Sequence, residues 1–427
     1  MRVLHTASTL TCSARPGLHA GPARRARRMR LESPVSPPTL SRQRERARLQ
    51  RDMTHLLLAG GGHSHAIALR NWLDDPLPGV TVTLVSPSAS TLYSGMVPGW
   101  LAGHYDHEEI AIDVEALCRA AGVRFRIGTV VSLDPVARTA TLADGETLAW
   151  DVLSLDVGST LTPPADAPCR VLALRPLGEL QPAWSNTLAD LAALPSAEPL
   201  RITAVGGGAA GIEALLAVLA RLRALLPDRQ VQGALVSSAT ELLPGMARGA
   251  ARSVGAALTA AGVSVQLGTP YERSDRLSDL LLWATGAEAH HWQRDSGLAV
   301  GRQGFIRIDA QMRSLSHPHV YATGDCAEWA EPLPKAGVYA VRMGPVLSRN
   351  LRTALVGGRA AAYKPQRRYL ALLSTADGRA VATWGNVAAS GRWAWRWKDS
   401  IDRAFVARFR VGPGRAPGAA KLINTEN

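Results

Sequence analysis

Short apolar runs alternate with helix-like patterns through the middle of the chain, and the same order occurs twice. In each copy an apolar run leads into glycines, a helical pattern follows, and a second apolar run ends the unit. Strands that alternate with helices in this way predict βαβ units and parallel sheets. We therefore expect an α/β fold with two Rossmann-like units. The expected segments are the strands 56–59 and 80–85 around a helix at about 64–74, and the strands 200–205 and 233–237 around a helix at 212–226.

A glycine-rich turn joins the first strand of each unit to its helix. In the pattern G-x-G-x-x-G, glycines bring the backbone close to a pyrophosphate, and the helix N-terminus presents free N–H groups to it. Two such turns, each in its βαβ context, predict two dinucleotides, one a bound flavin and one a diffusing nicotinamide. The candidate residues are Gly60, Gly61, Gly62, His63, Ser64 and His65 in the first turn, and Gly206, Gly208 and Gly211 in the second.

The first turn departs from the pattern at its last position, where His65 replaces the third glycine. The third glycine serves close packing of helix on strand, whereas the first two form the turn and admit the pyrophosphate. Because Gly60 and Gly62 are present, we expect a turn that still holds FAD, with a local shift in helix packing at His65. His63 and His65 either shape the turn or simply pack against the sheet.

Three further strands end in residues that suit a nucleotide. The runs Asp151–Gly158 and Asp279–Gly286 close on glycine, and a third run leads into Gly324 and Asp325. An aspartate directly after a glycine can hydrogen-bond a sugar-like hydroxyl while backbone amides meet a phosphate. Gly286, Gly324 and Asp325 are therefore candidate cofactor-binding residues.

The acidic residue expected about 20 positions beyond each turn is a serine in both units, Ser86 and Ser237. A serine hydroxyl can bind a ribose hydroxyl, although more weakly than a carboxylate does. No arginine follows Ser237 closely enough to mark a pocket for a 2′-phosphate. The choice between NADH and NADPH therefore stays open.

Composition and charge limit the other classes of function. The 427 residues, 46% of them hydrophobic, are enough for two or three domains. The net charge of +13 comes from the two ends of the chain. Residues 1–52 hold twelve arginines and three acidic residues, and residues 359–427 hold 13 basic and four acidic residues, so each end has a charge of +9. The remaining residues, 53–358, therefore have a net charge of −5. A mildly acidic body argues against nucleic-acid binding. The sequence contains no run of 18 consecutive apolar residues, so we expect no transmembrane helix.

Cysteine and histidine spacing argues against metal and dithiol chemistry. The four cysteines, Cys12, Cys118, Cys169 and Cys326, include no C-x-x-C pair, which disfavours a disulfide framework, a zinc ribbon and a redox-active dithiol. The histidine pairs lack a cysteine or carboxylate at ligand spacing, so no metal site is expected. Residues 1–52 are rich in arginine and lack apolar periodicity. We expect them to be disordered, or to precede the true translation start, since Met53 lies just before the first strand.

Several motifs resemble one family of flavoproteins. The segments GGGHSH (60–65), GGGAAGIE (206–213), WATGA (283–287) and HPHVYATGDCA (317–327) resemble the pyridine nucleotide–disulfide oxidoreductase superfamily. Within it, the chain is similar to the type II NADH dehydrogenase-like branch. It is also similar to a relative of that branch that some bacteria fuse to, or encode near, selenide, water dikinase. YSGMVPGWLAGHY (93–105), PKAGVYAVRMGPVLSRNL (334–351) and GRWAWRWKDSIDRAF (391–405) carry that likeness.

The resemblance implies a domain order in which one nucleotide domain is inserted into the other. An N-terminal extension precedes an FAD domain built from two parts of the chain, with an NAD(P) domain between them and a basic, Trp-rich segment at the end. The implied ranges are 1–52, 53–170 and 300–358 for the extension and the two FAD parts, 171–299 for the NAD(P) domain and 359–427 for the last segment.

The resemblance also implies roles for single residues. Asp325 would bind FAD near its ribityl–pyrophosphate portion, the second turn would hold NAD(P)H, and Glu213 would face the nicotinamide. A helix at 338–356 would pass beneath the flavin near the acceptor site, which places Lys335 and Tyr339 at the acceptor pocket. The alternatives are a buried polar Glu213 paired elsewhere, a solvated lysine and a packing tyrosine.

The implied function is that of an FAD-dependent NAD(P)H dehydrogenase that reduces a quinone-type acceptor without redox cysteines. The alternatives are a flavin reductase linked to selenium metabolism and a non-catalytic FAD-binding redox sensor. The resemblance leaves the identity of the acceptor open.

The C-terminal segment combines tryptophans with basic residues. From Trp397, apolar residues recur every fourth position at Ile401, Phe405 and Phe409. Such a helix either lies on an anionic membrane surface, packs on the FAD domain, or forms a homodimer interface. We expect a cytoplasmic protein, or one that is peripheral on the inner face of the bacterial cell membrane.

Overall fold

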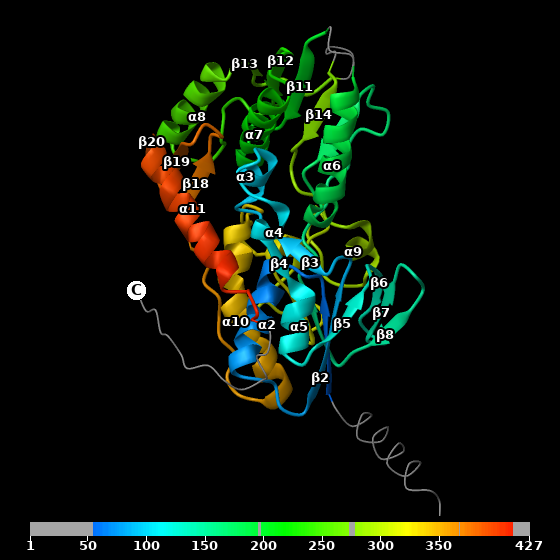
Figure 1. The fold of residues 1–427 in the computed structure, drawn as a ribbon. Coiled ribbons are helices and arrows are strands. Elements are labelled where there is room, and N and C mark those ends of the chain that lie inside the picture. Colours follow the sequence, from blue (N-terminus) through cyan, green and yellow to red (C-terminus); the bar gives the residue numbers. More distant parts are fainter. Residues whose placement is uncertain (1–53, 195–197, 273–277, 367, 413–427) are drawn as a thin grey trace, which may run out of the picture. The chain divides into compact units, whose positions relative to one another are not determined.

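The computed structural model describes residues 54–412, except 195–197, 273–277 and 367. The predicted N-terminal extension, 1–52, lies outside the described residues. Within the described part, the chain forms two five-stranded parallel sheets and several smaller sheets (Figure 1).

The first large sheet grows around the earliest apolar run. Leu56, Leu57 and Leu58 of its central strand are fully buried, because helices cover both faces of a parallel sheet. The strand order is β16-β9-β1-β2-β5. The edge strand β16 comes from much later in the sequence than the other four strands. The strands are β1 (Thr54–Ala59), β2 (Val80–Ser86), β5 (Arg124–Ile127), β9 (Val152–Leu155) and β16 (Val320–Ala322).

The second large sheet repeats this plan with residues from the middle of the chain. Its order is β10-β14-β11-β12-β13, and all of its paired strands are parallel. The central strand again leads into glycines and then into a helix. The strands are β10 (Arg170–Ala173), β11 (Leu200–Val205), β12 (Val231–Val236), β13 (Val263–Gln266) and β14 (Leu280–Trp283), and the helices are α6 (Leu177–Ala193), α7 (Ala209–Leu225) and α8 (Arg248–Ala260).

Helix α10 (Gly337–Val356) packs along α2 (His63–Asp74), and the two helices approach closely (Figure 1). A Cβ added at Gly344 of α10 would lie 2.8 Å from the Cβ of Ile67. The Ser64 hydroxyl also donates to the Ala340 carbonyl at 2.8 Å. This contact fixes α10 beside the first glycine turn.

Smaller elements surround the two sheets. The C-terminal part forms a three-stranded antiparallel sheet followed by one helix, α11 (Arg392–Ala407). The sheets are β3 (Ser90–Leu92) with β4 (Ala111–Asp113); β6 (Val130–Asp134) with β7 (Thr139–Leu142) and β8 (Thr147–Ala149); β15 (Ile306–Arg307) with β17 (Ala327–Glu328); and β18 (Leu370–Ser374) with β19 (Ala380–Trp384) and β20 (Val387–Gly391). The short helices are α3 (Val97–Leu101), α4 (His107–Ile110), α5 (Val114–Ala120), α9 (His291–Asp295) and the 3-10 turn η1 (Gly324–Cys326).

The predicted α/β class with two Rossmann-like units is confirmed. The first sheet contains strands on both sides of the second sheet's segment in sequence, as the insertion pattern expects. The exact domain limits stay a prediction.

The apolar positions that recur every fourth residue from Trp397 lie in two different environments. Trp397 and Ile401 are 43% and 41% exposed, whereas Phe405 and Phe409 are buried. Positions four apart drift around an α-helix, because 3.6 residues complete a turn. The C-terminal end of this series therefore packs inward while its beginning faces outward.

The α2–α10 contact predicts a stability change. Gly344→Ala forces a methyl group into the Ile67 side chain and should lower the free energy of unfolding by about 1–3 kcal/mol, as overpacking does. Gly255→Ala in α8 is the matched control, since its Cβ would meet Leu242 at an ordinary 3.6 Å. It should raise stability by about 0.5–1 kcal/mol through helix propensity. Chemical denaturation of both variants measures this, and equal effects would contradict the packing account.

Candidate functional site

The first glycine turn is fixed by close backbone approach. Gly60 has a φ of +96°, and a Cβ there would lie 2.3 Å from the Asp156 carbonyl oxygen at the end of β9. The Gly60 N–H donates to Val85 at 2.8 Å. Only glycine combines this φ with that contact.

The second turn has the same construction. Gly206 has a φ of +121°, its N–H donates to Val236 at 2.8 Å, and a Cβ would lie 2.3 Å from the Ala284 carbonyl oxygen at the end of β14. Asp156 and Ala284 therefore occupy equivalent places in the two units. The second unit serves as an internal comparison for the first.

Ser86 and Ser237 also take equivalent places. The Ser86 hydroxyl lies 2.9 Å from a Cβ built on Gly61, and the Ser237 hydroxyl lies 2.9 Å from a Cβ built on Gly207. Ser86 is the last residue of β2, Ser237 directly follows β12, and both are buried. The structure thus brings each serine to its own turn, where a ribose hydroxyl would lie in this kind of unit.

His65 replaces the third glycine by adding two hydrogen bonds. In the second unit, a Cβ on Gly211 would lie 2.2 Å from the Gly206 carbonyl oxygen. In the first unit, His65 Nδ1 contacts the Gly60 carbonyl oxygen at 2.7 Å, and Nε2 contacts the Ser154 hydroxyl at 2.8 Å. Burial lowers the pKa of His65 to about 4, so the ring is neutral. An imidazole therefore joins helix to strand where a glycine would permit direct contact.

Asp156 places a carboxyl group inside the first turn. Its Oδ2 accepts hydrogen bonds from the N–H groups of Ser64 at 2.8 Å and His65 at 3.1 Å, in the first turn of α2. The residue is 4% exposed. Burial raises the pKa of this carboxyl to about 7, although the two N–H groups oppose the shift. Ala284 has no such group in the second unit.

His63 brings an imidazole with an open polar atom to the same place. Its Nε2 is buried and has no hydrogen-bond partner among the described residues. The ring lies beside the contacting pair of Tyr93 and Phe405, with centroid distances of 5.7 and 6.4 Å. Burial lowers the pKa of His63 to about 4, while Asp325 acts in the opposite direction.

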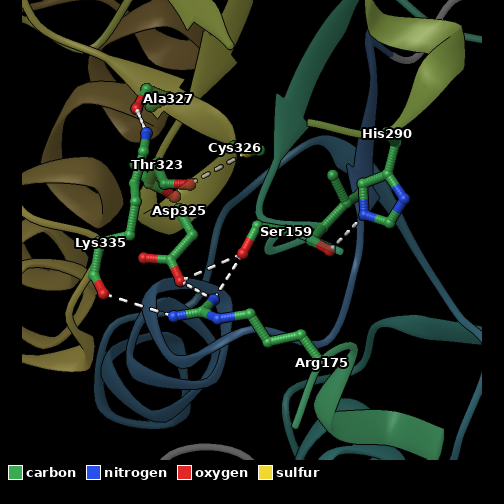
Figure 2. Close-up of polar contacts among 9 residues, drawn as sticks. Ser159, Arg175, His290, Thr323, Asp325, Cys326, Ala327 and Lys335 are labelled. Carbon is green, nitrogen blue, oxygen red and sulfur yellow. Dashed lines mark hydrogen bonds and ion pairs between the residues drawn. The ribbon is translucent and has the colours of Figure 1, made fainter. Parts of the chain in front are cut away.

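The turn at Gly324 and Asp325 carries a compact polar network (Figure 2). The Arg175 guanidinium forms an ion pair with Asp325 and donates to the Ser159 hydroxyl. It also donates to the Lys335 carbonyl oxygen at 3.3 Å. Gly324 has a φ of +64° and faces the Asp156 carboxyl, which a Cβ would approach to 2.7 Å.

Lys335 and Tyr339 lie at the start of α10 but point to different partners. The Lys335 ammonium donates to the Ala327 carbonyl oxygen at 2.6 Å and lies 3.6 Å above the centre of the Phe305 ring. Burial lowers the pKa of Lys335, and Asp325 partly offsets this effect. Tyr339 is buried against Tyr369. The solvated-lysine alternative is therefore wrong.

Glu213 of α7 meets the C-terminal segment. Its Oε1 accepts the Ser374 N–H at 2.7 Å, next to the buried ion pair of Lys398 and Asp402, whose charged atoms are 2.7 Å apart. Burial raises the pKa of Glu213 to about 7, with Lys398 opposing. Glu213 is thus tied to the C-terminal segment by this hydrogen bond.

The remaining glycines leave open space. A Cβ on Gly208 or Gly286 would meet nothing within 4 Å. No side chain caps the N-terminus of α7 in the part of the chain that the structure describes. The second turn therefore has both the space and the free N–H groups that a pyrophosphate needs.

Sequence reasoning missed Asp156, Ser154, Ser159 and Arg175. A signal for Asp156 was present, because the runs DVLSLDVG and DLLLWATG both close on glycine and only the first has an acidic residue two positions before it. Arg175 gave none, since its partner Asp325 is 150 residues away. Among the described residues, no group of three or more histidines, cysteines and carboxylates has the geometry of a metal site.

A family model described as pyridine nucleotide-disulphide oxidoreductase matches residues 59–344, more than half of the chain. The chain belongs to this family. Its members are oxidoreductases that use FAD with NAD(P)H, so the predicted cofactors and the general class of FAD-dependent oxidoreductase are confirmed.

Individual relatives agree with the family at lower similarity. The ferroptosis suppressor protein 1 of Taeniopygia guttata is 25% identical over 280 residues, which are 57% of this chain and 67% of that protein. Two solved structures share the fold. The sulfide:quinone oxidoreductase of Aquifex aeolicus has a TM-score of 0.69 at 16% identity over 84% of this chain and 91% of its own. NDH2 of Plasmodium falciparum in complex with NADH has a TM-score of 0.67 at 12% identity, over 83% and 98%.

The first turn fits the pyrophosphate of FAD on three observations. The N–H groups of Gly62 and His63 have no acceptor within the described residues, and the Nε2 of His63 is buried without a partner. Asp325 and Arg175 lie beside them with charged groups for a ribityl hydroxyl and a phosphate. The Asp156 carboxyl conflicts with this fit, because it already accepts the neighbouring N–H groups of Ser64 and His65.

The neutral state of His65 predicts a pH-dependent stability difference. His65→Gln keeps one hydrogen bond at most and should cost about 1–3 kcal/mol at pH 7.5. The folded pKa of His65 lies below its ordinary 6.5, so its stabilising contribution is complete above pH 6.5 and is lost as the pH falls toward 4. The difference between wild type and variant should therefore shrink by about 1 kcal/mol between pH 6.5 and 5.5. Denaturation at three pH values measures it, and a constant difference would contradict a neutral buried ring.

Proposed function

We propose that this protein is an FAD-dependent NAD(P)H dehydrogenase that passes electrons to a quinone. The observation that carries the proposal is the pair of equivalent turns, one lined by Asp156 and His63 and one open at Gly208. FAD, when bound, supplies the hydride-accepting chemistry between NAD(P)H and the acceptor. The protein's residues hold both nucleotides and exclude water.

The first unit would hold FAD and the second would hold NAD(P)H. Gly60, Gly62 and His63 would bind the flavin pyrophosphate, and Asp325 would bind its ribityl chain with Arg175 close by. Ser86 and Ser237 would bind the two riboses. Gly206, Gly208, Gly211 and Gly286 would line the nicotinamide nucleotide.

The three cysteines among the described residues support a direct path from flavin to acceptor. A redox cysteine acts as a thiolate, and burial raises the pKa of both Cys118 and Cys326 to about 12. Cys326 also donates to the Thr323 carbonyl oxygen, which holds it in the turn. Cys169 is half-buried, and its pKa is raised as well.

Lys335, Tyr339 and Glu213 are the proposed catalytic residues. Lys335 and Tyr339 lie at the N-terminal end of α10, close to the Asp325 turn, where the acceptor pocket would be. Glu213, with a pKa near 7, can hold or release a proton at neutral pH. That property suits a quinone, because its two-electron reduction also takes up two protons.

The resemblance to type II NADH dehydrogenases, and to the flavoprotein associated with selenide, water dikinase, stays a prediction from the motifs. No helix among the described residues is both long and apolar enough to cross a bilayer.

We propose that the outer face of α11 contacts an anionic membrane. Trp393 and Trp397 are 51% and 43% exposed, their rings stack at 6.2 Å, and Ile401 extends the apolar surface. Arg392 and Arg396 are exposed beside them. Tryptophan beside arginine suits the boundary between headgroups and acyl chains.

Reduction of the flavin tests the proposed dehydrogenase. Anaerobic mixing of the FAD-loaded chain with NADH or NADPH should bleach the flavin absorbance with one equivalent of nucleotide per FAD. A soluble quinone should then restore the absorbance of oxidised flavin. Two equivalents per FAD would indicate a redox-active disulfide and contradict the direct path. Bound flavin that neither nucleotide reduces would favour a redox sensor.

Gly208→Ala separates the two turns. The added methyl group meets no protein atom, so folding and FAD content should be retained. Because it fills the space beside the α7 N-terminus, the rate of flavin reduction at low NAD(P)H should fall about 10- to 100-fold, which corresponds to about 1.4–2.8 kcal/mol. Unchanged reduction with full FAD content would place NAD(P)H elsewhere.

Vesicle binding tests the α11 surface. Wild type should co-sediment with phosphatidylglycerol vesicles and much less with phosphatidylcholine vesicles. Trp393→Ser with Trp397→Ser should lower the bound fraction at least fivefold, on the order of 1 kcal/mol. Val136→Ser, which removes an 85% exposed apolar side chain elsewhere, should leave binding unchanged. Equal loss in both variants, or equal binding to both lipids, would refute the membrane contact.

A further inference from the structure

The Asp156 carboxyl lies in the space that a pyrophosphate normally takes. The second glycine of the pattern is small so that the phosphates can approach the backbone. At Gly62, which is this second glycine, a Cβ would lie 2.4 Å from the Asp156 carboxyl carbon. The equivalent Gly208 faces open space. The first turn therefore holds a resident anion-like group where the second turn holds none.

The same carboxyl bridges three parts of the site. It accepts two N–H groups from α2, extends from the end of β9, and lies against Gly324 of η1. The α2 N-terminus favours a negative charge at this place. A flavin pyrophosphate on the neighbouring N–H groups of Gly62 and His63 would put further negative charge beside an almost fully buried carboxylate, which is unfavourable.

We propose that Asp156 is a cofactor-binding residue that carries a proton when FAD is bound, so that flavin binding takes up one proton. A neutral carboxyl can still accept the two α2 N–H groups through one oxygen and can donate from the other to a phosphate oxygen. This inference rests on the use of FAD by the family.

The groups that face Asp156 leave it as the local titrating group near neutral pH. On α2, His63 and His65 have pKa values lowered to about 4 by burial. On η1, burial raises the pKa of Cys326 to about 12, and Asp325 is paired with Arg175. In the flavin-free chain the Asp156 carboxyl has a pKa of about 7, and a bound phosphate raises this pKa further. FAD affinity should therefore be greatest below pH 7 and fall as the pH rises.

The test is the dissociation constant of FAD for the flavin-free full chain, from pH 6 to pH 8.5, followed by flavin fluorescence. For wild type it should rise about tenfold per pH unit above pH 7, the limit for one coupled proton. For Asp156→Asn, the dissociation constant of FAD should change less than twofold between pH 6 and pH 8.5. Asp156→Ala, which introduces the residue of the second unit, should also be flat.

Two controls assign the effect. Asp151→Asn removes a carboxylate at the other end of β9, where it accepts the His55 N–H at 2.7 Å, and should keep the wild-type slope. Glu213→Gln removes the other carboxyl with a pKa near 7 and should keep it as well. A flat wild-type curve, an unchanged slope in Asp156→Asn, or a slope lost in Glu213→Gln would overturn the proposal.

Calorimetry on wild type alone covers the case in which the variants do not fold. Titration of FAD at pH 8 in two buffers of different ionisation enthalpy should give an uptake of close to one proton per FAD. An uptake near zero would mean that Asp156 moves away or stays charged, and would overturn the proposal. Failure to bind FAD at any pH is a different result, which would overturn the cofactor assignment itself.

Discussion

One buried carboxyl group determines how the first nucleotide site is built. Asp156 fills the space at Gly62, accepts two N–H groups of α2 and faces Gly324, so three chain segments meet around it. An acid in this position needs either a proton or a counter-charge, because burial of an unpaired charge is costly. The site therefore joins cofactor binding to protonation, while the second site, with Ala284, has no such coupling.

The neighbouring substitutions follow from the same architecture. His65 replaces a glycine, and Ser154 on β9 supplies the hydroxyl that its ring requires. The equivalent residues of the second unit, Gly211 and Leu282, need neither group. Where the second turn has close apolar packing, the first turn has buried hydrogen bonds. Such a buried network is stable only when each of its polar groups has a partner.

The sequence was sufficient for the fold class and for the two turns, because periodicity and glycine spacing are local signals. Helix α7 begins at Ala209 rather than 212, since glycines and alanines carry no apolar period. Asp156 and Arg175 were missed because their partners lie 92 and 150 positions away. The sequence could not predict which apolar side chains of α11 are buried. Phe405 packs inward and Trp397 is exposed because of contacts that only the folded chain makes.

A crystal structure of the FAD-loaded chain tests the central claim most directly. The account predicts a pyrophosphate on the N–H groups of Gly62 and His63, with a phosphate oxygen within hydrogen-bond distance of the Asp156 carboxyl. That short contact between two oxygen acceptors would require a proton between them. A pyrophosphate at the second turn, or an Asp156 side chain turned out of the first, would contradict the account.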